Sequence, residues 1–283
     1  VLPFDNFSDD PGSGYFTDGV MEDIVSHISR IRDLHVISRT SAMTYRGSSK
    51  PARQIAQELR VGSILEGSVR RAGERVRVVA QLIDASSDKH VWAETYDRDL
   101  NDIFQVQSDV AEKIAGALRA RLEPEQVKRI RQRPTADLKA YELCVRGRQL
   151  ISRLAASQHE QGVELLERAI GLDPEFALAH AYLSYAHAIS PYYSGGAGTV
   201  AFPAARAAAE RALELDEGLS AAWIARALVR YHFDWDWTGA LEDFARAERL
   251  DPNDPDVHYW RGHALAVMRQ FERATEAHER STA

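Results

Sequence analysis

Several kinds of residue are scarce in this chain of 283 residues, and each scarcity excludes a class of protein. Cys144 is the single cysteine, which excludes an internal disulfide and a cysteine-rich zinc site but leaves the redox compartment open. No run of about eighteen apolar residues is present, so the sequence predicts no transmembrane helix. An initiator methionine and a signal peptide are also missing from the first residues, so we expect a fragment of a longer protein.

Positive charge is not in excess in either half of the chain. Residues 1–122 hold 16 Lys and Arg against 18 Asp and Glu, and the remainder holds 19 against 24, for a net charge of −7. One basic run, at residues 128–133, is most simply a solvated helix end. We therefore expect no nucleic-acid contact by this part of the protein.

A phrase of eight residues recurs through the second half of the chain. It occupies residues 167–174, returns at 210–217 and 245–252, and begins again at 279. The arginines of the four copies, at positions 168, 211, 246 and 280, lie 43, 35 and 34 residues apart. The last two steps resemble the roughly 34-residue period of the tetratricopeptide repeat (TPR), a helix-turn-helix unit that must stack on its neighbours to bury its apolar face.

Two positions of the repeated phrase have a predicted role in packing. A small residue lets the neighbouring helix approach closely, at Ala169, Ala212 and Ala247. A leucine three residues later is expected to fill the seam between repeats, at Leu172, Leu215 and Leu250. In two copies a proline then ends the helix, because proline lacks the amide donor.

The first 122 residues predict a mixed-sheet α/β sandwich. Amphipathic helices are expected at 17–30, 51–59 and 103–118, and strands at 1–4, 34–37, 64–70, 75–83 and 91–96. Strand alternation puts one apolar set of the fourth of these strands on a common face, namely Val76, Val78, Ala80 and Leu82. We expect this domain at 1–122, a linker at 123–136, and an α-solenoid of about four helix pairs at 137–283, the last one truncated.

Five separated words of the first half resemble a known family. They are LPFDN at 2–6, YFTDG at 15–19, LEGSVR at 65–70, QLIDA at 81–85 and WAETYDR at 92–98. In this order they resemble the TolB-like N-terminal domain, which in bacteria is commonly followed by TPR repeats. The resemblance implies the C-terminal regulatory half of a larger bacterial signalling protein. The upstream part of such proteins is often a class III adenylate/guanylate cyclase domain or a winged-helix DNA-binding domain, sometimes separated by a membrane segment.

The sequence offers no set of residues for catalysis, a cofactor or a metal. It has no glycine-rich loop followed by lysine, and no matched metal-binding aspartates such as class III cyclases use. The histidines His258 and His263 are five residues apart, whereas two ligands on one helix face need a spacing near four. Glu66 is expected to pair with Arg39 or Arg70, because an unpaired carboxylate in an apolar strand is costly.

Three interpretations of the function follow. The first is a non-catalytic regulatory module whose helix pairs bind a protein or peptide in a groove, lined by His187, Ile224, Tyr231, Tyr259 and His263. The second is the regulatory portion of an adenylate/guanylate cyclase, which controls cyclic-nucleotide synthesis by an upstream domain. The third is a small-molecule receptor at the domain junction.

Compartment and oligomeric state stay open at the level of sequence. An extracytoplasmic, periplasmic location is favoured if a membrane segment precedes this region. An array cut inside its fourth repeat is expected to expose an apolar helix face, through which copies of the chain could self-associate.

Overall fold

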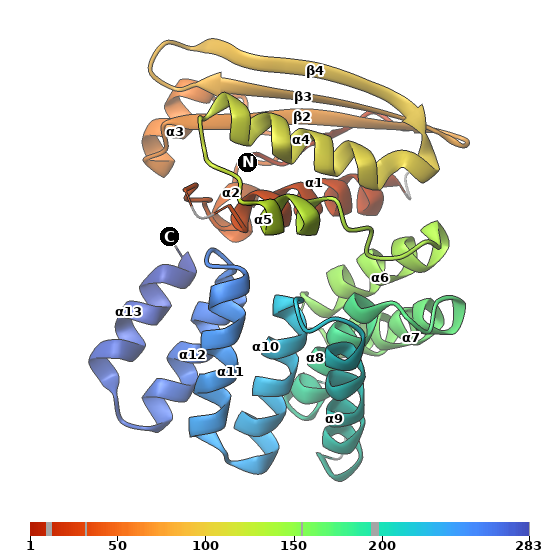
Figure 1. The fold of residues 1–283 in the computed structure, drawn as a ribbon, viewed down its shortest axis with the longest axis vertical. Helices are drawn as coiled ribbons and strands as arrows, with labels where there is room; N and C mark the ends of the chain where they lie inside the picture. Colours follow the sequence, from red (N-terminus) through yellow and green to blue (C-terminus); the bar gives the residue numbers. More distant parts are fainter. Residues whose placement is uncertain (10–12, 32, 154, 194–197, 283) are drawn as a thin grey trace. The chain divides into compact units, whose positions relative to one another are not determined.

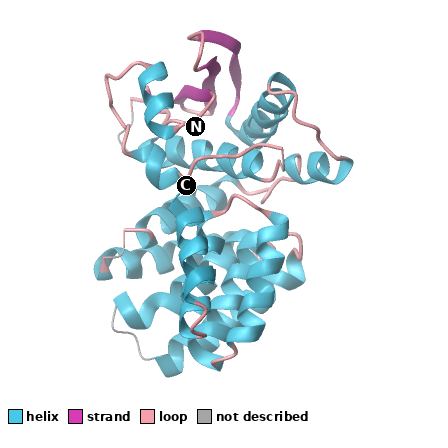
Figure 2. Ribbon diagram, turned by 90° about the vertical axis from the view of Figure 1, so that its left-hand side faces the viewer, coloured by secondary structure: helices cyan, strands magenta, loops and turns pink. Residues whose placement is uncertain are grey.

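The computed structural model describes residues 1–9, 13–31, 33–153, 155–193 and 198–282. It divides into two compact units, Val1–Gln132 and Arg133–Ser281. All strands of the described residues lie in the N-terminal unit, and the C-terminal unit is helical (Figure 1 and Figure 2). The chain is therefore mostly helical, with a small mixed sheet near its N-terminus. None of the described helices is long and apolar enough to span a membrane.

The sheet has four strands in the order β1-β2-β3-β4, namely β1 (Asp5–Asn6), β2 (Ser63–Ala72), β3 (Arg75–Asp84) and β4 (Lys89–Asp99). The short β1 runs parallel to β2, and the other neighbours are antiparallel. Gly73 lies in the turn between β2 and β3 with φ of 61°, a left-handed conformation that glycine adopts without strain. A hairpin with a two-residue turn results.

Helices pack against the sheet and against each other in this unit. The two long ones, α1 (Ser13–Ser29) and α4 (Ile103–Ala117), contact each other and the strands (Figure 1). The shorter ones are α2 (Arg39–Met43), α3 (Ala52–Leu59), the 3-10 turn η1 (Leu100–Asp102) and α5 (Pro124–Ile130). The inward face of β3 is buried as the alternation predicted, with Val76, Val78, Ala80 and Leu82 at most 2% exposed.

Residues 123–136, where a linker was expected, contain α5. Its last residue, Ile130, is fully buried, and the Ile130 carbonyl accepts a hydrogen bond of 2.6 Å from the Ser108 hydroxyl of α4. α5 therefore packs on α4 as part of the N-terminal unit.

Three expectations for the N-terminal unit are wrong. The first strand is Asp5–Asn6 rather than 1–4, although the Leu2 N–H donates a hydrogen bond of 2.8 Å to the Leu65 carbonyl. The segment 34–37 is a loop rather than a strand, and its side chains line a pocket instead of joining a ladder. Among the described residues, Glu66 does not pair with an arginine. It accepts a hydrogen bond from Gln81, which lies directly opposite across the β2–β3 ladder. Arg39 pairs with Glu22 at 2.5 Å between Nε and Oε1, so the cross-strand register decided the partner of Glu66.

The C-terminal unit consists of four helix pairs in the described residues. The pairs are α6 (Leu138–Ile151) with α7 (Ala156–Leu172), α8 (Ala177–Tyr193) with α9 (Gly198–Leu215), α10 (Ser220–Val229) with α11 (Trp237–Leu250), and α12 (Pro255–Val267) with α13 (Phe271–Thr282). A π-helical turn, η2 (Arg230–Asp234), follows α10. The long first step of the repeat coincides with residues 191–198, of which 194–197 lie outside the described residues.

The alanines of the repeated phrase lie where close packing was predicted. Ala169, Ala212 and Ala247 are all fully buried. The leucines three residues later do not fill the seam, because Leu172 is 44% exposed and Leu215 and Leu250 are only half-buried. Each leucine is the last residue of its helix, at the edge of the interface. Large side chains one turn before the alanine, such as Phe244, occupy the core instead.

In three of the helix pairs, a ring nitrogen on the first helix forms a hydrogen bond to the turn that precedes that helix. Each ring N–H donates a hydrogen bond to a carbonyl six residues earlier, at 3.0 Å for His180 and Pro174, 3.0 Å for His258 and Pro252, and 2.8 Å for Trp223 and Glu217. The acceptors follow the C-terminal ends of α7, α9 and α11, so a carbonyl in the turn after each helix is satisfied. Two of the histidines thus have a structural role in the repeat.

The surface of α13 differs from the apolar face that was expected at the end of the array. Ala274 and Ala277 are buried beside Leu265. The charged residues of this helix are exposed, namely Glu272, Arg273, Glu276, Glu279 and Arg280. Phe271, at 61%, is the one large apolar side chain that the described part of α13 exposes. This helix therefore lacks a broad apolar face for self-association.

We expect Gly147→Ala to destabilise the C-terminal unit. A Cβ on Gly147 of α6 would lie 2.9 Å from the backbone oxygen of Gly162 in α7, and one on Gly162 would lie 2.8 Å from the oxygen of Gly147. Forcing two backbones apart costs about 1–3 kcal/mol. Denaturant unfolding followed by helical circular dichroism measures the loss.

Gly171→Ala is the matched control for that substitution. Gly171 lies in α7 as well, and apart from its chain neighbours and the adjoining backbone of α7, no atom of the described residues lies within 4 Å of the point where its Cβ would stand. Alanine there should leave stability unchanged or raise it by about 0.5–1 kcal/mol, because glycine is a poor helix former. Equal effects at positions 147 and 171 would contradict the close approach of α6 and α7.

Candidate functional site

The structure brings together three of the five residues predicted to line a partner groove. Tyr259 and His263 of α12 are in ring contact, with centroids 4.7 Å apart, and Tyr231 joins the same cluster of rings through His232. Ile224 is only 4% exposed and lies in the core of the unit, where no partner can reach it. Its assignment to a binding surface is therefore wrong.

His187 lies apart from that cluster. It is on α8, and the groups that act on its charge, Glu167 and His159, belong to α7. Burial lowers the pKa of His187, and Glu167 opposes that shift. His187 therefore faces the preceding helix rather than the ring cluster.

Ten rings make a continuous cluster, which we call the aromatic surface. Neighbouring centroids are 4.6 to 6.5 Å apart, and the members come from α8, α9, η2, α12 and α13: Tyr185, Tyr192, Phe202, Tyr231, His232, Phe233, Tyr259, Trp260, His263 and His278. Three of them are well exposed, with Tyr192 at 62%, Phe233 at 42% and Tyr259 at 44%. The cluster thus reaches solvent at several points of one unit.

His232 is the centre of the aromatic surface. Its ring contacts those of Tyr192, Phe202, Tyr231 and Trp260, and its Nδ1 is 3.0 Å from the Tyr192 hydroxyl. Its Nε2 is buried and has no hydrogen-bond partner among the described residues. Burial lowers the pKa of His232 to about 4, with a further contribution from the nearby His263. The ring is therefore neutral at pH 7 and packs as an aromatic side chain.

The π-helical turn η2 positions three members of the surface in succession. An α-helix widens to π geometry by one residue in a turn, and such turns are frequent at functional sites. η2 ends at Trp235, which has φ of 57°. Asp234 pairs with Arg206 of α9, and the Arg206 guanidinium lies 5.7 Å from the centroid of the Phe233 ring. The turn is thereby held against α9.

A buried carboxylate on α11 forms an ion pair with the turn η2. Asp243 of α11 is 3% exposed at its side chain and pairs with Arg226 at 2.7 Å and with Arg230 at 3.0 Å. Arg230 also donates a hydrogen bond of 2.9 Å to the carbonyl of Gly239. These charged hydrogen bonds join α10 and η2 to α11, so the exposed rings stand on a rigid base.

Gly262 makes room for the last ring of the cluster. A Cβ at this position of α12 would come within 2.6 Å of the His278 ring of α13. That ring contacts Tyr259 at 5.9 Å and His263 at 5.0 Å. The small residue in α12 thus lets α13 contribute to the aromatic surface.

Sequence reasoning missed most members of the cluster. Tyr192 and His232 are 40 residues apart, and Phe202 and Trp260 belong to other repeats. The sequence does contain an aromatic run at 231–237, but its Trp235 is 70% exposed and contacts Trp237 rather than the rings of the aromatic surface. The described residues contain no cluster of three or more His, Cys, Asp or Glu able to hold a metal ion.

Comparison with known proteins identifies one repeat and one relative. Residues 236–267 match the TPR repeat family, and this segment runs from α11 through α12. The C-terminal unit therefore contains a TPR repeat. The chain is also 46% identical over 184 residues to a protein of Rhizobium meliloti (strain 1021) named "Putative adenylate cyclase 3". That alignment covers 65% of this chain but 31% of the relative, so the chain spans about a third of the relative's length.

Solved structures of MamA show a weaker likeness. One crystal structure of MamA is 19% identical, with a TM-score of 0.36 over 65% of this chain and 93% of that one. MamA from Desulfovibrio magneticus RS-1 is 14% identical, with a TM-score of 0.35 over 64% of this chain and 92% of that one. TM-scores of this size do not establish a shared arrangement of the repeats.

Proposed function

We propose that this chain is a non-catalytic regulatory region and that its C-terminal unit binds a protein partner through the aromatic surface. The observation that carries the proposal is the exposure of Tyr192, Phe233 and Tyr259 within one ring cluster of a unit that contains a TPR repeat. Monomeric proteins seldom expose joined aromatic side chains without a use for them. Tyrosine and tryptophan are also the residues most often found at the centre of protein interfaces.

The chemistry of the surface selects the kind of partner. Its histidines His232 and His263 both have pKa values lowered by burial, so the rings present apolar area with few charges at neutral pH. The exposed Tyr192 and Tyr259 also carry hydroxyl groups that can form hydrogen bonds. An extended or helical peptide with apolar or aromatic side chains matches such a surface.

The N-terminal unit is proposed to be a TolB-like domain. Five sequence words in the family's order support this, together with a small mixed sheet whose strands carry three of the words. The relative's name favours a cyclase over a winged-helix regulator as the remaining part of the protein. Catalysis is then assigned to a region outside this chain, and this chain is assigned its control.

The first prediction concerns the aromatic surface. Replacing Tyr259 and His263 together with alanine should weaken partner binding by about 30-fold, because central aromatic residues of interfaces contribute about 2 kcal/mol or more. The melting temperature should change little, because Tyr259 is 44% exposed. Quantitative pull-down of a partner, with thermal unfolding in parallel, tests both statements.

Phe271→Ala is the control for that double variant. Phe271 lies in the same unit and is more exposed than Tyr259, at 61%, but it takes no part in the aromatic surface. It should leave binding unchanged. Loss of binding in the control, or retention in the double variant, would move the interface away from the aromatic surface.

The second prediction concerns cyclic-nucleotide synthesis. This chain alone, incubated with ATP and Mg²⁺, should form no cyclic AMP. The full-length gene product that contains it should form cyclic AMP, and the Tyr259 and His263 double variant should change that rate while Phe271→Ala leaves it alone. Turnover by this chain by itself would contradict the non-catalytic assignment.

The third prediction concerns pH. His232 has a pKa of about 4 in the folded protein against 6.5 for an unperturbed histidine, so the unfolded state binds the proton first as pH falls. Stability is therefore complete above pH 6.5 and is lost between pH 6.5 and 4, by at most about 3 kcal/mol from this group. His232→Phe should flatten that part of the profile.

Tryptophan fluorescence is a suitable measurement for this pH dependence. Four of the five tryptophans, Trp223, Trp235, Trp237 and Trp260, lie in the C-terminal unit, so their unfolding signal reports mainly on it. His159→Gln is a useful comparison, because burial lowers its pKa too although it lies on α7 outside the cluster. If the stability of His232→Phe depends on pH in the same way as that of the wild type, His232 has an unperturbed pKa and the prediction fails.

A further inference from the structure

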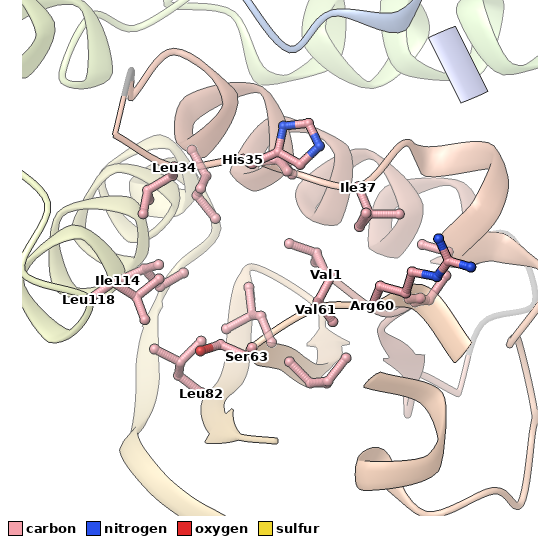
Figure 3. A pocket seen from close by; sticks show the side chains of 17 residues that line it. Val1, Leu34, His35, Ile37, Arg60, Val61, Ser63, Leu82, Ile114 and Leu118 are labelled. Atoms are coloured by element: carbon pink, nitrogen blue, oxygen red, sulfur yellow. The ribbon is translucent and has the colours of Figure 1, made fainter. Parts of the chain in front are cut away.

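The N-terminal unit contains a pocket of 310 Å³ that is independent of the aromatic surface (Figure 3). Its walls come from α1, the loop after it, α2, α3, β2, β3 and α4. Most of the lining is apolar, as in Leu34, Ile37, Leu59, Ile64, Leu82 and Ile114. Small-molecule sites commonly have volumes of about 300 to 1,000 Å³, so the pocket suits a small ligand.

Open space continues beside the first residues of β2. Gly62 lines the pocket, and apart from its two chain neighbours no atom of the described residues lies within 4 Å of the position where its Cβ would stand. The loop at 34–37 forms the opposite wall, and Figure 3 shows Ile37 and Leu34 at that side. The loop that was expected to be a strand therefore has a definite place as part of this wall.

The polar groups of the pocket are few and carry no negative charge. Among its lining residues only His35, Arg60 and Ser63 have polar side chains. Figure 3 shows the His35 ring directed away from the pocket and the Arg60 side chain extending to its edge. Within the part of the chain that the structure describes, neither the Arg60 guanidinium nor the Ser63 hydroxyl has a hydrogen-bond or ion-pair partner.

The backbone places Arg60 at this edge. Arg60 ends α3 in the left-handed conformation, with φ of 56°, and its N–H bonds to the carbonyls of Ala56 and Gln57. Glycine is the usual residue at such a helix end, because a side chain there is strained. The strained position turns the chain directly into Val61 and Gly62, which line the pocket.

We infer that this pocket binds a small molecule with an apolar body and an anionic head group, such as a medium-chain carboxylate. The apolar body would lie on Leu82 and Ile114, where each buried methylene contributes about 0.8 kcal/mol. The carboxylate would pair with the Arg60 guanidinium at the edge of the pocket. A cationic head group has no acidic side chain to meet in the lining.

Titration calorimetry with three probes of one chain length tests the inference on the chain as it stands. Octanoate should bind, octanol should bind about tenfold more weakly, and octylamine should show no binding, because a charged hydrogen bond to Arg60 is present only with the carboxylate. No heat with octanoate, or equal affinity for octylamine, would overturn the proposal.

Two variants locate the bound probe. Arg60→Gln should weaken octanoate binding about tenfold and leave octanol unaffected, whereas Arg53→Gln, an exposed arginine of the same helix outside the lining, should change neither. Ile37→Phe, which fills the pocket from the loop, should abolish binding of both probes. Octanoate binding that survives Arg60→Gln and Ile37→Phe unchanged places the ligand elsewhere and refutes the site.

The full-length gene product supplies the last test. If octanoate binds this chain but not the longer protein, other residues of that protein occupy the pocket and the proposal fails. Binding to both supports a ligand site in the regulatory region. The result is separable from the proposed partner surface, because the Tyr259 and His263 double variant should bind octanoate normally while losing its partner.

Discussion

Close contact between helix backbones at small residues is the constraint on which the C-terminal unit depends. Gly147 and Gly162 allow α6 and α7 to touch through their main chains, and Ala169, Ala212 and Ala247 are fully buried at equivalent points of the repeat. With interfaces this tight, the larger side chains can occupy only a few positions. Aromatic side chains of this unit occur in both places: Phe176 and Phe244 are fully buried, whereas Tyr192, Phe233 and Tyr259 are exposed and belong to the aromatic surface.

Ion pairs fix the position of the turn η2, which carries three rings of the aromatic surface. Asp243 forms ion pairs with two arginines, one of them in η2, and Arg206 pairs with Asp234 at the other end of the same turn. A surface fixed in this way loses little conformational entropy when a partner binds, which favours affinity for a given area. Its central histidine is neutral because burial disfavours the charged ring. Recognition by this unit is therefore expected to rest on shape and apolar contact more than on charge.

The N-terminal unit combines a small sheet with a pocket that regular structure does not fill. Strand alternation buries one face of β3 against helices, while the loop at 34–37 and the end of α3 leave a space between them. An uncovered apolar space in a folded unit forgoes dispersion contacts unless a ligand occupies it. The proposed partner surface and the proposed ligand pocket are two distinct sites, as coupling between two signals requires.

Sequence alone determined the features that depend on local period and composition. The step between the arginines predicted stacked helix pairs, the alternation in β3 predicted its buried face, and the alanines were assigned their packing role, because each depends on residues close in the chain. Tertiary structure decided the partner of Glu66, the exposure of Leu172 and the burial of Ile224. It also brought Tyr192 to His232 across 40 residues. These outcomes depend on strand register and on the angles between helices, which are set by the packing of the whole unit and leave no periodic signal in the sequence.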